Sequence, residues 1–370
     1  MRASILLPSV NKKHITFLDE DQVLRLVWLA LCDTATNATQ EIKDWFLPEL
    51  VDPVSVTKLA DGLHPRDGYE VHYGRDTSQS LKDASVVILR RGSVSSDLIA
   101  SAPNLRLIQR LGARPESIDL VAAKAAGVAV SCLPRPTLVY TAEHVLLLML
   151  SLAKRLLAAD KVVRSGDYDP SLVKPVNDIA YNWPGLANIG GLYGHTLGIV
   201  GLGEVGALVV ERARALGMTI IYCKRIRLPA VRERALDVSY RPLDALLADS
   251  DFVSVHASNI GPNDRLIGRA AFASMKRTAF FINTSRGRLV DEDALFDALA
   301  AGMIAGAGLD VHQVEPRQAN DRFAALPNVV MTPHIAGGTR LGLLKEATAI
   351  FTNMRAALAG EPPPQGRILP

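Results

Sequence analysis

Short apolar runs alternate with segments of helical apolar spacing over the second half of the chain. The apolar runs predict buried strands at residues 197–200, 219–222, 252–255, 279–282, 306–309 and 329–331. The spacing of apolar residues between these runs predicts helices at 204–216, 243–248, 265–275 and 292–301. Because strand and helix alternate, this half is expected to form a parallel, doubly wound sheet. Ligands of such sheets bind beyond the carboxyl ends of the strands.

The first half repeats the alternation more weakly, which indicates a second α/β domain. Its predicted strands lie at 24–31, 86–90, 105–109 and 128–131, and its predicted helices at 41–50, 97–100 and 120–126. Pro134 and Pro136 mark the boundary, since proline interrupts regular structure. One long apolar helix is predicted over 137–163, and a final helix over 339–359 could return to the first domain. Residues 1–22 show no informative pattern.

Composition narrows the class of protein. A chain of 370 residues favours two domains, and 48% hydrophobic with 21% charged residues is typical of globular proteins. The net charge is only +3 and the arginines are scattered, so no nucleic-acid partner is expected. The longest apolar stretch, 145–153, is half of a membrane span, so we expect a soluble protein without membrane contact. Cys32, Cys132 and Cys223 are far apart, which predicts neither disulfide nor metal site and fits the cytoplasm.

A glycine motif joins a predicted strand to a predicted helix. Gly201 permits the tight turn, Gly203 lets a pyrophosphate approach bare backbone, and Gly206 lets helix and strand pack closely. The phosphates would bind the first amides of the helix, at Glu204 and Val205, where unpaired N–H groups and the helix dipole favour negative charge. The motif predicts a bound dinucleotide and redox chemistry. The alternative is an ordinary strand–helix turn with three chance glycines.

Three further motifs follow the glycine motif: Asn283-Thr284-Ser285-Arg286-Gly287, Gly308-Leu309-Asp310-Val311 with Glu315-Pro316, and Thr332-Pro333-His334-Ile335-Ala336-Gly337. In this order and spacing, the set resembles the D-isomer-specific 2-hydroxyacid dehydrogenases. That family includes phosphoglycerate dehydrogenase and the glyoxylate/hydroxypyruvate reductases. The resemblance runs from about residue 86 to residue 360, and Ala142-Glu143-His144 belongs to it.

The resemblance implies a fold class and an assembly. A Rossmann domain with a doubly wound parallel sheet, residues 134–333, would be inserted into a second, flavodoxin-like α/β substrate-binding domain. The second domain would be split between residues 1–133 and 334–370, and the active cleft would lie between the domains. Members of the family are usually homodimers built through the long helix. No C-terminal regulatory domain is expected after residue 360.

The resemblance also implies catalytic roles. Arg286 would bind the substrate carboxylate and polarise its carbonyl group, since a guanidinium is always charged and forks onto carboxylate oxygens. His334 would donate a proton to the carbonyl oxygen, because histidine is the natural acid and base near neutral pH. Glu315 would pair with His334 and favour its protonated form. Taken singly, such an arginine is usually a surface residue and such a histidine a structural one.

Other residues are assigned to the cofactor by the same resemblance. Asp310 would contact the nicotinamide amide, and Thr284 and His256 would line the cofactor site. His144 is interpreted as a packing residue or as one that couples the domains.

The chain departs from the family at the adenosine end of the cofactor. An NAD enzyme usually presents an acidic residue to the ribose after the second strand, and here Lys224 stands in that place. A cation cannot accept hydrogen bonds from ribose, but it can neutralise a 2′-phosphate, and Arg225 could fork onto the same group. We therefore predict that NADP is preferred over NAD. The alternative is a solvated basic loop.

Two loops are predicted to contact the substrate. The family often holds the substrate carboxylate with Gly-x-Gly amides, where this chain has Gly112, Ala113 and Arg114. The first two amides could still bind the carboxylate, and Arg114 could bind a second anionic group, although an exposed arginine is the default. Arg91 and Gly92 form the other candidate loop, again after a strand.

The expected enzyme is an oxidoreductase that transfers a hydride between NAD(P)H and a small 2-keto acid, giving a D-2-hydroxy acid. Glyoxylate, hydroxypyruvate and the 3-phosphoglycerate type are the substrate candidates. A different class is a dinucleotide-sensing binding protein of the corepressor kind, as some relatives are. A third possibility is a formate- or phosphite-type dehydrogenase, because those enzymes also use an arginine and a histidine.

Overall fold

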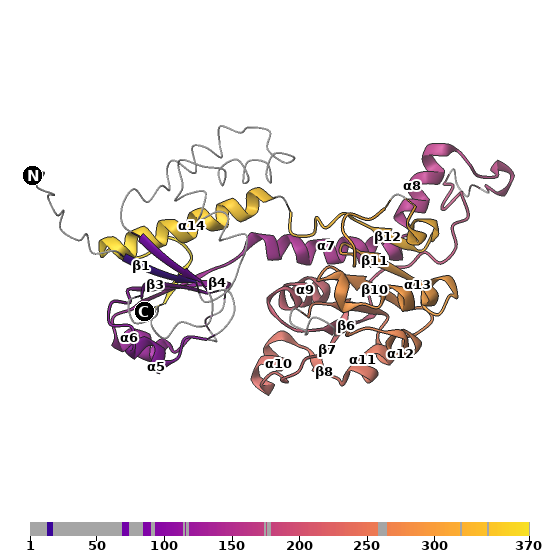
Figure 1. Ribbon diagram of the computed structural model, residues 1–370. Coiled ribbons are helices and arrows are strands. Elements are labelled where there is room, and N and C mark those ends of the chain that lie inside the picture. The colour runs from indigo at the N-terminus through magenta and orange to yellow at the C-terminus, as the bar shows by residue number, and fades with distance from the viewer. Residues whose placement is uncertain are drawn as a thin grey trace, which may run out of the picture. The chain divides into compact units, whose positions relative to one another are not determined.

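The computed structural model describes residues 13–17, 69–73, 84–89, 93–113, 115, 118–173, 175, 179–257, 265–318, 320–338 and 340–369. The chain divides into two compact units, which are described separately (Figure 1). Unit 1 consists of residues 1–136 and 339–370, and unit 2 of residues 137–338. The sequence places the two joins at 133/134 and 333/334, a few residues before these.

Unit 2 is built on a seven-stranded sheet. Its strands are β6 (Thr196–Val200), β7 (Thr219–Cys223), β8 (Ser239–Tyr240), β9 (Phe252–Val255), β10 (Phe280–Asn283), β11 (Gly306–Leu309) and β12 (Val329–Met331). The spatial order is β12-β11-β10-β9-β6-β7-β8, and every pairing is parallel. The order reverses between β6 and β9, which is the switch point where doubly wound sheets bind ligands. The predicted Rossmann-type sheet is confirmed.

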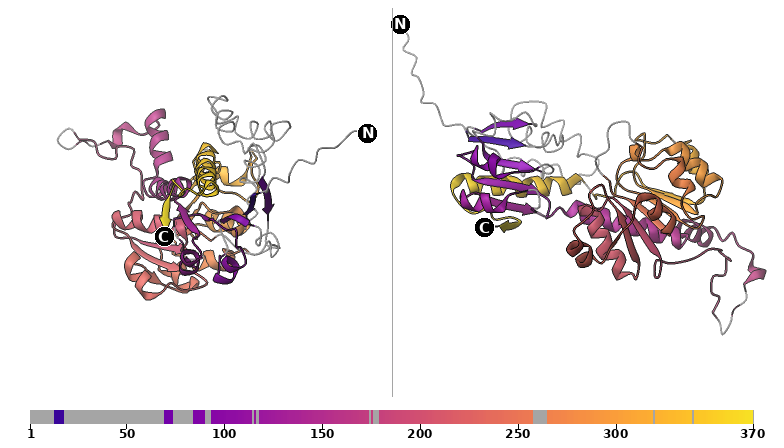
Figure 2. Two further views of the ribbon diagram at one scale, coloured as in Figure 1. Left: turned by 90° about the vertical axis from the view of Figure 1, so that its left-hand side faces the viewer. Right: turned by 90° about the horizontal axis from the view of Figure 1, so that it is seen from below.

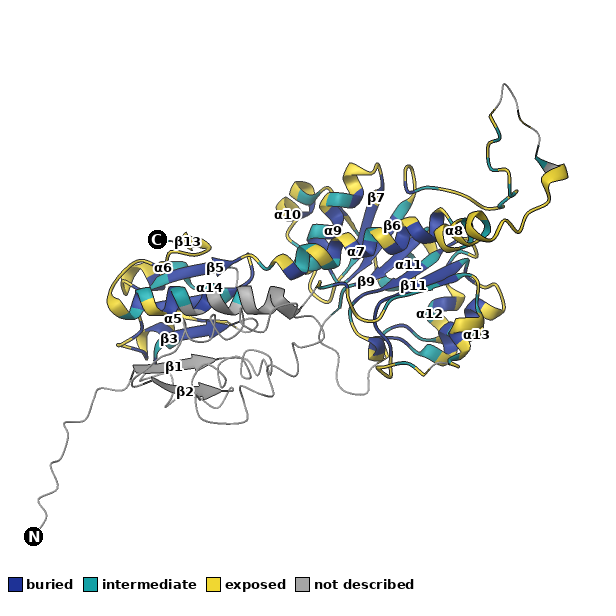
Figure 3. Ribbon diagram, turned by 90° about the horizontal axis from the view of Figure 1, so that it is seen from above, coloured by how far each residue is buried: buried dark blue, intermediate teal, exposed yellow. Residues whose placement is uncertain are grey.

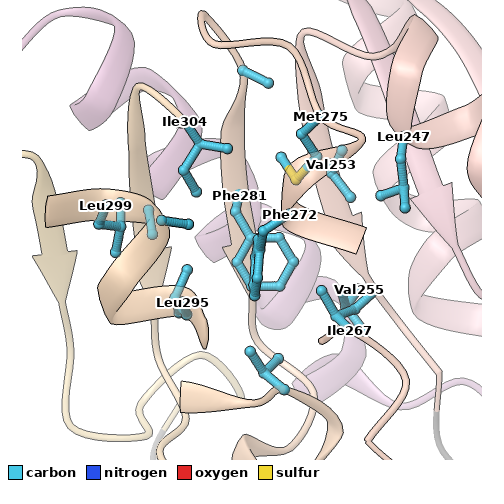
Figure 4. Packing of buried hydrophobic residues seen from close by; sticks show 14 of the residues in the cluster. Leu247, Val253, Val255, Ile267, Phe272, Met275, Phe281, Leu295, Leu299 and Ile304 are labelled. Atoms are coloured by element: carbon cyan, nitrogen blue, oxygen red, sulfur yellow. The ribbon is translucent and has the colours of Figure 1, made fainter. Parts of the chain in front are cut away.

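Helices cover both faces of this sheet (Figures 1 and 3). They are α7 (Pro136–Ala153), α9 (Glu204–Ala215), α10 (Ala230–Leu236), α11 (Leu243–Asp249), α12 (Arg269–Ala273) and α13 (Glu292–Ala300), whereas α8 (Leu156–Ser165) has no buried residue. One core layer joins α7 and α9 to the sheet, and the other joins α11, α12 and α13 to it. In the second layer the rings of Phe272 and Phe281 meet edge to face, between Leu295 and Val253 (Figure 4). Strand β8 and helix α10 were not predicted from the sequence.

The predicted helix over 137–163 is two helices. Arg155 adopts a left-handed backbone conformation with φ of +51°, so α7 ends and α8 begins in a new direction. Helix α7 is long and apolar enough to cross a membrane by length and composition, with a mean hydropathy of 1.4. One of its faces, with Val145, Leu148 and Met149, packs in the core of unit 2, as expected of a core helix.

Unit 1 contains a six-stranded sheet with β1 (Lys13–Phe17), β2 (Tyr69–Tyr73), β3 (Ala84–Leu89), β4 (Leu107–Leu111), β5 (Ala129–Leu133) and β13 (Arg367–Leu369). The order is β13-β5-β4-β3-β1-β2, with β13 antiparallel to β5 and the other pairs parallel. The five parallel strands thus follow the flavodoxin-like order 2-1-3-4-5. Residues 1–22 contain strand β1, which the sequence did not predict, whereas the predicted strand 24–31 and helix 41–50 lie outside the described residues.

Helix α14 (Arg340–Ala359) packs along the sheet of unit 1 (Figure 2), and α5 (Ser96–Ala100) and α6 (Leu120–Ala125) complete its layers. A buried polar network fixes α14. Asn353 Nδ2 donates to Gln109 Oε1 at 2.8 Å, and Asn353 Oδ1 accepts from the Gln365 amide at 2.8 Å. The network ties the C-terminal segment to the central strands, because buried amide groups must be paired.

Candidate active site

The glycine turn of unit 2 has the geometry that each of its three positions requires. Gly201 has φ of +98°, and a Cβ there would lie 2.7 Å from the Ala257 nitrogen, so only glycine fits. A Cβ on Gly206 would lie 3.0 Å from the Gly201 carbonyl oxygen, which shows how closely helix α9 approaches the turn. A Cβ on Gly203 would have no neighbour within 4 Å. The turn is therefore open only where bare backbone would meet a ligand.

Two further features fit a dinucleotide at this turn. Gly203 is the N-cap of α9 and brings no side chain to cap its first amides, so the positive end of the helix is available to phosphate. Thr284, just after β10, has a buried hydroxyl group with no hydrogen-bond partner among the described residues. Such a group in a native protein calls for a ligand or a water.

A basic segment follows β7 beside the glycine turn. The Gly201 amide donates to the Cys223 carbonyl oxygen at 3.0 Å, so the segment starts next to the turn. Lys224 and Arg225 are exposed at this point. Burial raises the pKa of the Cys223 thiol to about 11, so that thiol stays protonated at neutral pH.

The third cation of the segment, Arg227, is exposed but is paired with a carboxylate of the same chain. Its Nε and Nη2 atoms donate to the two Glu233 oxygens at 2.8 Å, and its guanidinium lies over the Tyr240 ring. Tyr222, fully buried, donates to Glu233 at 2.6 Å and accepts from the Leu228 amide at 3.0 Å. We call Tyr222, Arg227 and Glu233 the clamp. Hydrogen bonds from Arg227 and then Tyr222 hold the pKa of Glu233 at about 2.

His256 follows β9 and closes the back of the glycine turn. A Cβ on Gly201 would lie 2.8 Å from its carbonyl carbon, and its ring nitrogen Nε2 lies 2.9 Å from the Ser254 hydroxyl. Burial lowers the pKa of His256 to about 4, so its ring is neutral near pH 7.

Three neighbouring strands bring the remaining candidate residues to one edge of the sheet. Arg286 follows β10, Asp310 follows β11 and His334 follows β12 (Figure 1). The loops are joined directly, because the Asp310 amide donates to Asn283 at 3.0 Å and the His334 amide donates to the Asp310 carbonyl at 2.8 Å. Carboxyl ends of adjacent parallel strands are where such sheets build their sites.

The loops after β10 and β11 are also packed backbone against backbone. A Cβ on Gly287 would lie 2.0 Å from the His312 carbonyl carbon, so no other residue fits there. This contact places the segment that carries Arg286 against the segment that carries Glu315. The Arg286 side chain is exposed at the strand ends.

His334 and Glu315 form the predicted pair. His334 Nδ1 lies 2.8 Å from Glu315 Oε2, and the other carboxylate oxygen accepts from the His312 amide at 2.9 Å. Burial acts to raise the pKa of Glu315, but the hydrogen bonds from His334 and His312 outweigh it and lower that pKa. The His334 side chain is 47% exposed, so Nε2 is the ring nitrogen left to exchange a proton with a ligand.

The Asp310 carboxylate organises the His334 loop. Its Oδ1 accepts from the Thr332 hydroxyl at 2.6 Å and from the Ile335 amide at 2.9 Å, while Oδ2 accepts from the Ala336 amide at 2.9 Å. Asp310 is fully buried. Its contact with a nicotinamide amide stays a prediction.

Several residues support this site through contacts that the sequence did not predict, among them His144, which was interpreted as a packing or domain-coupling residue. His144 Nε2 lies 2.9 Å from the Thr332 hydroxyl, and burial lowers the pKa of His144 despite the nearby Asp310. His312 Nε2 donates to the Thr332 carbonyl oxygen at 3.1 Å. Arg317, on the same loop as His312, donates from Nη2 to Glu292 Oε2 at 3.0 Å. A polar ring in an apolar helix was the available signal for His144, because a buried polar group needs a partner.

The predicted substrate loops belong to unit 1. Arg91, Gly92 and Arg114 lie outside the described residues. Gly112 follows β4 with φ of +147°, and its amide donates to the Leu133 carbonyl oxygen at 2.9 Å. That amide is therefore engaged within the protein. Ala113 is exposed just beyond it.

Comparison with known proteins identifies the family of this chain. Residues 146–336 match the family model described as the NAD-binding domain of D-isomer-specific 2-hydroxyacid dehydrogenases. A glyoxylate reductase of Korarchaeum cryptofilum is 36% identical over 77% of this chain and 83% of its own length. A glyoxylate reductase of Thermococcus litoralis is 37% identical over 76% of this chain and 82% of its own length. The crystal structure of a glyoxylate reductase from Paecilomyes thermophila superposes with a TM-score of 0.54 at 26% identity, covering 96% of this chain and 97% of that one.

The clamp generates a pH-dependent prediction. Glu233 has a pKa of about 2 in the folded protein, below its ordinary 4.5, so its carboxylate stabilises the fold above about pH 4.5. This contribution is lost as the pH falls toward 2. We expect Glu233→Gln to lower Tm near neutral pH and the difference from wild type to shrink below about pH 4.5. Scanning fluorimetry across pH measures it. Asp237→Asn, which breaks the exposed pair with Arg214, should have little effect, and an equal loss there would contradict the prediction.

Proposed function

Because the chain belongs to the D-isomer-specific 2-hydroxyacid dehydrogenases, we propose that it is an NADPH-dependent reductase of small 2-keto acids, of the glyoxylate and hydroxypyruvate type. The observation that carries the proposal is the His334–Glu315 pair, which lies one strand from Asp310 and two from Arg286. A protein that only senses a dinucleotide has no need of such a pair. The named activity of the relatives favours the same substrates.

The chain's own residues supply the rest of the chemistry once a nicotinamide dinucleotide supplies the hydride. The Arg286 guanidinium binds the substrate carboxylate in a forked pair and polarises the C2 carbonyl group. His334 gives the proton on Nε2 to the carbonyl oxygen, which becomes the hydroxyl group of the product. Glu315 accepts from Nδ1 and thereby orients the ring. In the reverse direction His334 takes the proton back.

We propose the loops after β3 and β4 of unit 1 as further substrate-binding segments. Ala113 and Arg114 follow β4, and Arg91 with Gly92 follows β3, its neighbour in the sheet. Gly112 serves by its backbone conformation, since its amide is engaged with Leu133. A small keto acid needs one such anion site, and a phosphorylated one would also need Arg114.

The preference for NADP rests on charge beside the glycine turn. Lys224 and Arg225 are the cations proposed to bind the 2′-phosphate, next to the turn that binds the pyrophosphate. Glu233 is the carboxylate nearest in sequence on α10, but it is saturated by Arg227 and Tyr222 and does not serve the ribose hydroxyls. A phosphate is thus matched by cations, whereas a bare ribose would lack its usual acceptor.

We also propose a homodimer, formed through α7, α8 and the segment after α8, which projects from the sheet of unit 2 (Figure 1). This surface exposes Leu147, Leu150, Leu156, Leu157, Val163, Tyr168, Ile179, Tyr181, Trp183, Ile189 and Tyr193. Beside it, a hollow of about 670 Å³ is lined by Leu152, Leu157, Ile189, Phe252, Phe280 and Val329, among others. Exposed large apolar residues that concentrate in one stretch of the chain favour an interface, and a projecting segment with an adjacent hollow suits a two-fold pair of identical chains. Within this proposal the enzyme works in the cytoplasm.

The catalytic roles are tested by substitution. We expect His334→Gln to lower kcat for glyoxylate reduction about 100- to 10,000-fold, because the proton donor is lost, while the Kd of NADPH is unchanged. Arg286→Ala should raise KM for the keto acid and lower kcat. Loss of NADPH absorbance and a cofactor titration measure the two quantities. Arg288→Ala removes an exposed arginine two residues away and serves as the control. Full turnover in His334→Gln would end the proposal.

The cofactor preference is tested by binding. We expect wild type to bind NADPH more tightly than NADH, and the double variant Lys224→Ala/Arg225→Ala to lose about 10- to 100-fold in NADPH affinity with little change for NADH. Each lost contact is a charge-assisted hydrogen bond to phosphate. Fluorescence titration gives both Kd values. The double variant Arg232→Ala/Arg234→Ala removes two positive charges from exposed positions of α10 and should leave selectivity intact. A wild-type preference for NADH would contradict the assignment.

The assembly is tested by mass. We expect light scattering after gel filtration to give twice the mass of the chain for wild type, and Leu157→Asp with Tyr181→Asp to give the mass of one chain, because charge on the apolar surface opposes association. Val121→Asp alters a comparably exposed apolar residue on α6 of unit 1 and should remain dimeric. A monomeric wild type would refute the interface.

A further inference from the structure

Helix α7 carries a histidine on its buried face. His144 is 8% exposed and lies between the apolar core residues Val145 and Ala142 of the same helix. A polar ring at such a position costs free energy unless it is hydrogen-bonded. Its partner is the Thr332 hydroxyl, 2.9 Å from Nε2, on the segment that follows β12. The two residues come from parts of the chain 188 positions apart.

His144, Thr332 and Asp310 form a row of hydrogen bonds, and the number of protons available determines which group donates in each. The Thr332 hydroxyl has one proton, which it donates to the Asp310 carboxylate at 2.6 Å. The same hydroxyl must then accept from His144, so Nε2 of His144 carries a proton. His144 Nε2 is 3.6 Å from Asp310 Oδ1 and acts on it chiefly through Thr332.

Asp310, at one end of this row of hydrogen bonds, holds the backbone around His334. Three successive amides, those of residues 334, 335 and 336, donate to the Asp310 carbonyl oxygen, Oδ1 and Oδ2 in turn. His334 itself has φ of +57°, a conformation that a side-chain-bearing residue rarely adopts without support. The position of its imidazole therefore depends on how firmly Asp310 is held.

The distance between α7 and the sheet lets His144 reach Thr332. A Cβ on Gly308 of β11 would lie 2.9 Å from the Leu148 Cβ, so the helix lies as close to the strand as a glycine allows. Leu148 and His144 are four residues apart and share one face of the helix. Close packing of Leu148 against β11 brings His144 within hydrogen-bond distance of Thr332.

We propose that His144 is a positioning residue for the acid–base site, which holds the His334 main chain through Thr332 and Asp310. This inference rests on the proposed acid–base role of His334. It assigns to α7 a part in catalysis although no residue of α7 touches the reacting atoms.

Paired variants separate the hydrogen bond from the bulk of the ring. In His144→Gln the amide nitrogen takes the place of Nε2 and can still donate to Thr332, whereas in His144→Asn the shorter side chain places its nitrogen at the Nδ1 position. Thr332→Ser keeps the hydroxyl group, and Thr332→Val keeps the shape without it. Glu143→Gln, at an exposed neighbouring position of α7, is the control.

Two readouts are expected to move together. His144→Asn and Thr332→Val should lower kcat for the keto acid at least about 10-fold with an unchanged Kd for NADPH, while His144→Gln and Thr332→Ser stay near wild type. Hydrogen exchange of the amides at 334–336, followed by mass spectrometry, should be faster in the first two variants and unchanged in strand β9. The double variant His144→Asn/Thr332→Val should lose no more than Thr332→Val alone, because both act in one chain of contacts.

Each result decides the inference. Normal exchange at 334–336 in His144→Asn, or additive losses in the double variant, would overturn it. Exchange that rises throughout unit 2 would also overturn it, since it would show a general loss of stability. If wild type fails to reduce any keto acid, the proposed function fails, but the exchange measurement still tests whether His144 holds the loop. Should Thr332→Val not fold, the contrast between His144→Gln and His144→Asn decides alone.

Discussion

A buried carboxylate at the end of β11 holds together the part of the molecule where the chemistry would take place. Asp310 receives two successive main-chain amides and a threonine hydroxyl from the segment after β12. Water is excluded there, so each of these hydrogen bonds is stronger than it would be at the surface, and losing any of them would leave a buried charge under-compensated. The left-handed conformation of His334 is tolerable because its neighbours are fixed in this way. The pairing of His334 with Glu315 follows from that placement.

Much of unit 2 was predictable because two physical rules act within short stretches of sequence. Buried parallel strands are short apolar runs, so β9, β11 and β12 match their predictions at both ends. The glycine turn was recognisable because it has steric requirements that no other residue meets. The break between α7 and α8 was missed for a local reason. Apolar spacing continues across it, and the left-handed residue is Arg155, whereas glycine is the residue that usually marks such a change. Strand β1 was missed because its sequence, KHITF, mixes polar with apolar residues and contains no apolar run.

The types of the candidate site residues and the pairing of His334 with Glu315 were predictable from the sequence, but the other hydrogen-bond partners were not. Lys224, Arg225 and Arg227 look alike as a basic run, and only the folded chain shows that Glu233 neutralises the third of them. Thr332 stands inside a recognisable motif, yet its link to His144 depends on how α7 lies over the sheet. Contacts between distant segments arise from packing, which no local pattern encodes. Within the clamp, a buried tyrosine sets the shape of a loop whose charges face outward.

The glycine at position 308 has a consequence that extends beyond packing. It leaves so little space between a helix and a strand that a Cβ at this position would lie 2.9 Å from the Leu148 Cβ. A methyl group there would push α7 outward without removing any group that meets a ligand, and the imidazole on the far loop would lose its alignment. Mutations that silence this enzyme are therefore to be sought also among residues that define spacing, and a survey confined to residues that contact the substrate or the cofactor would overlook them.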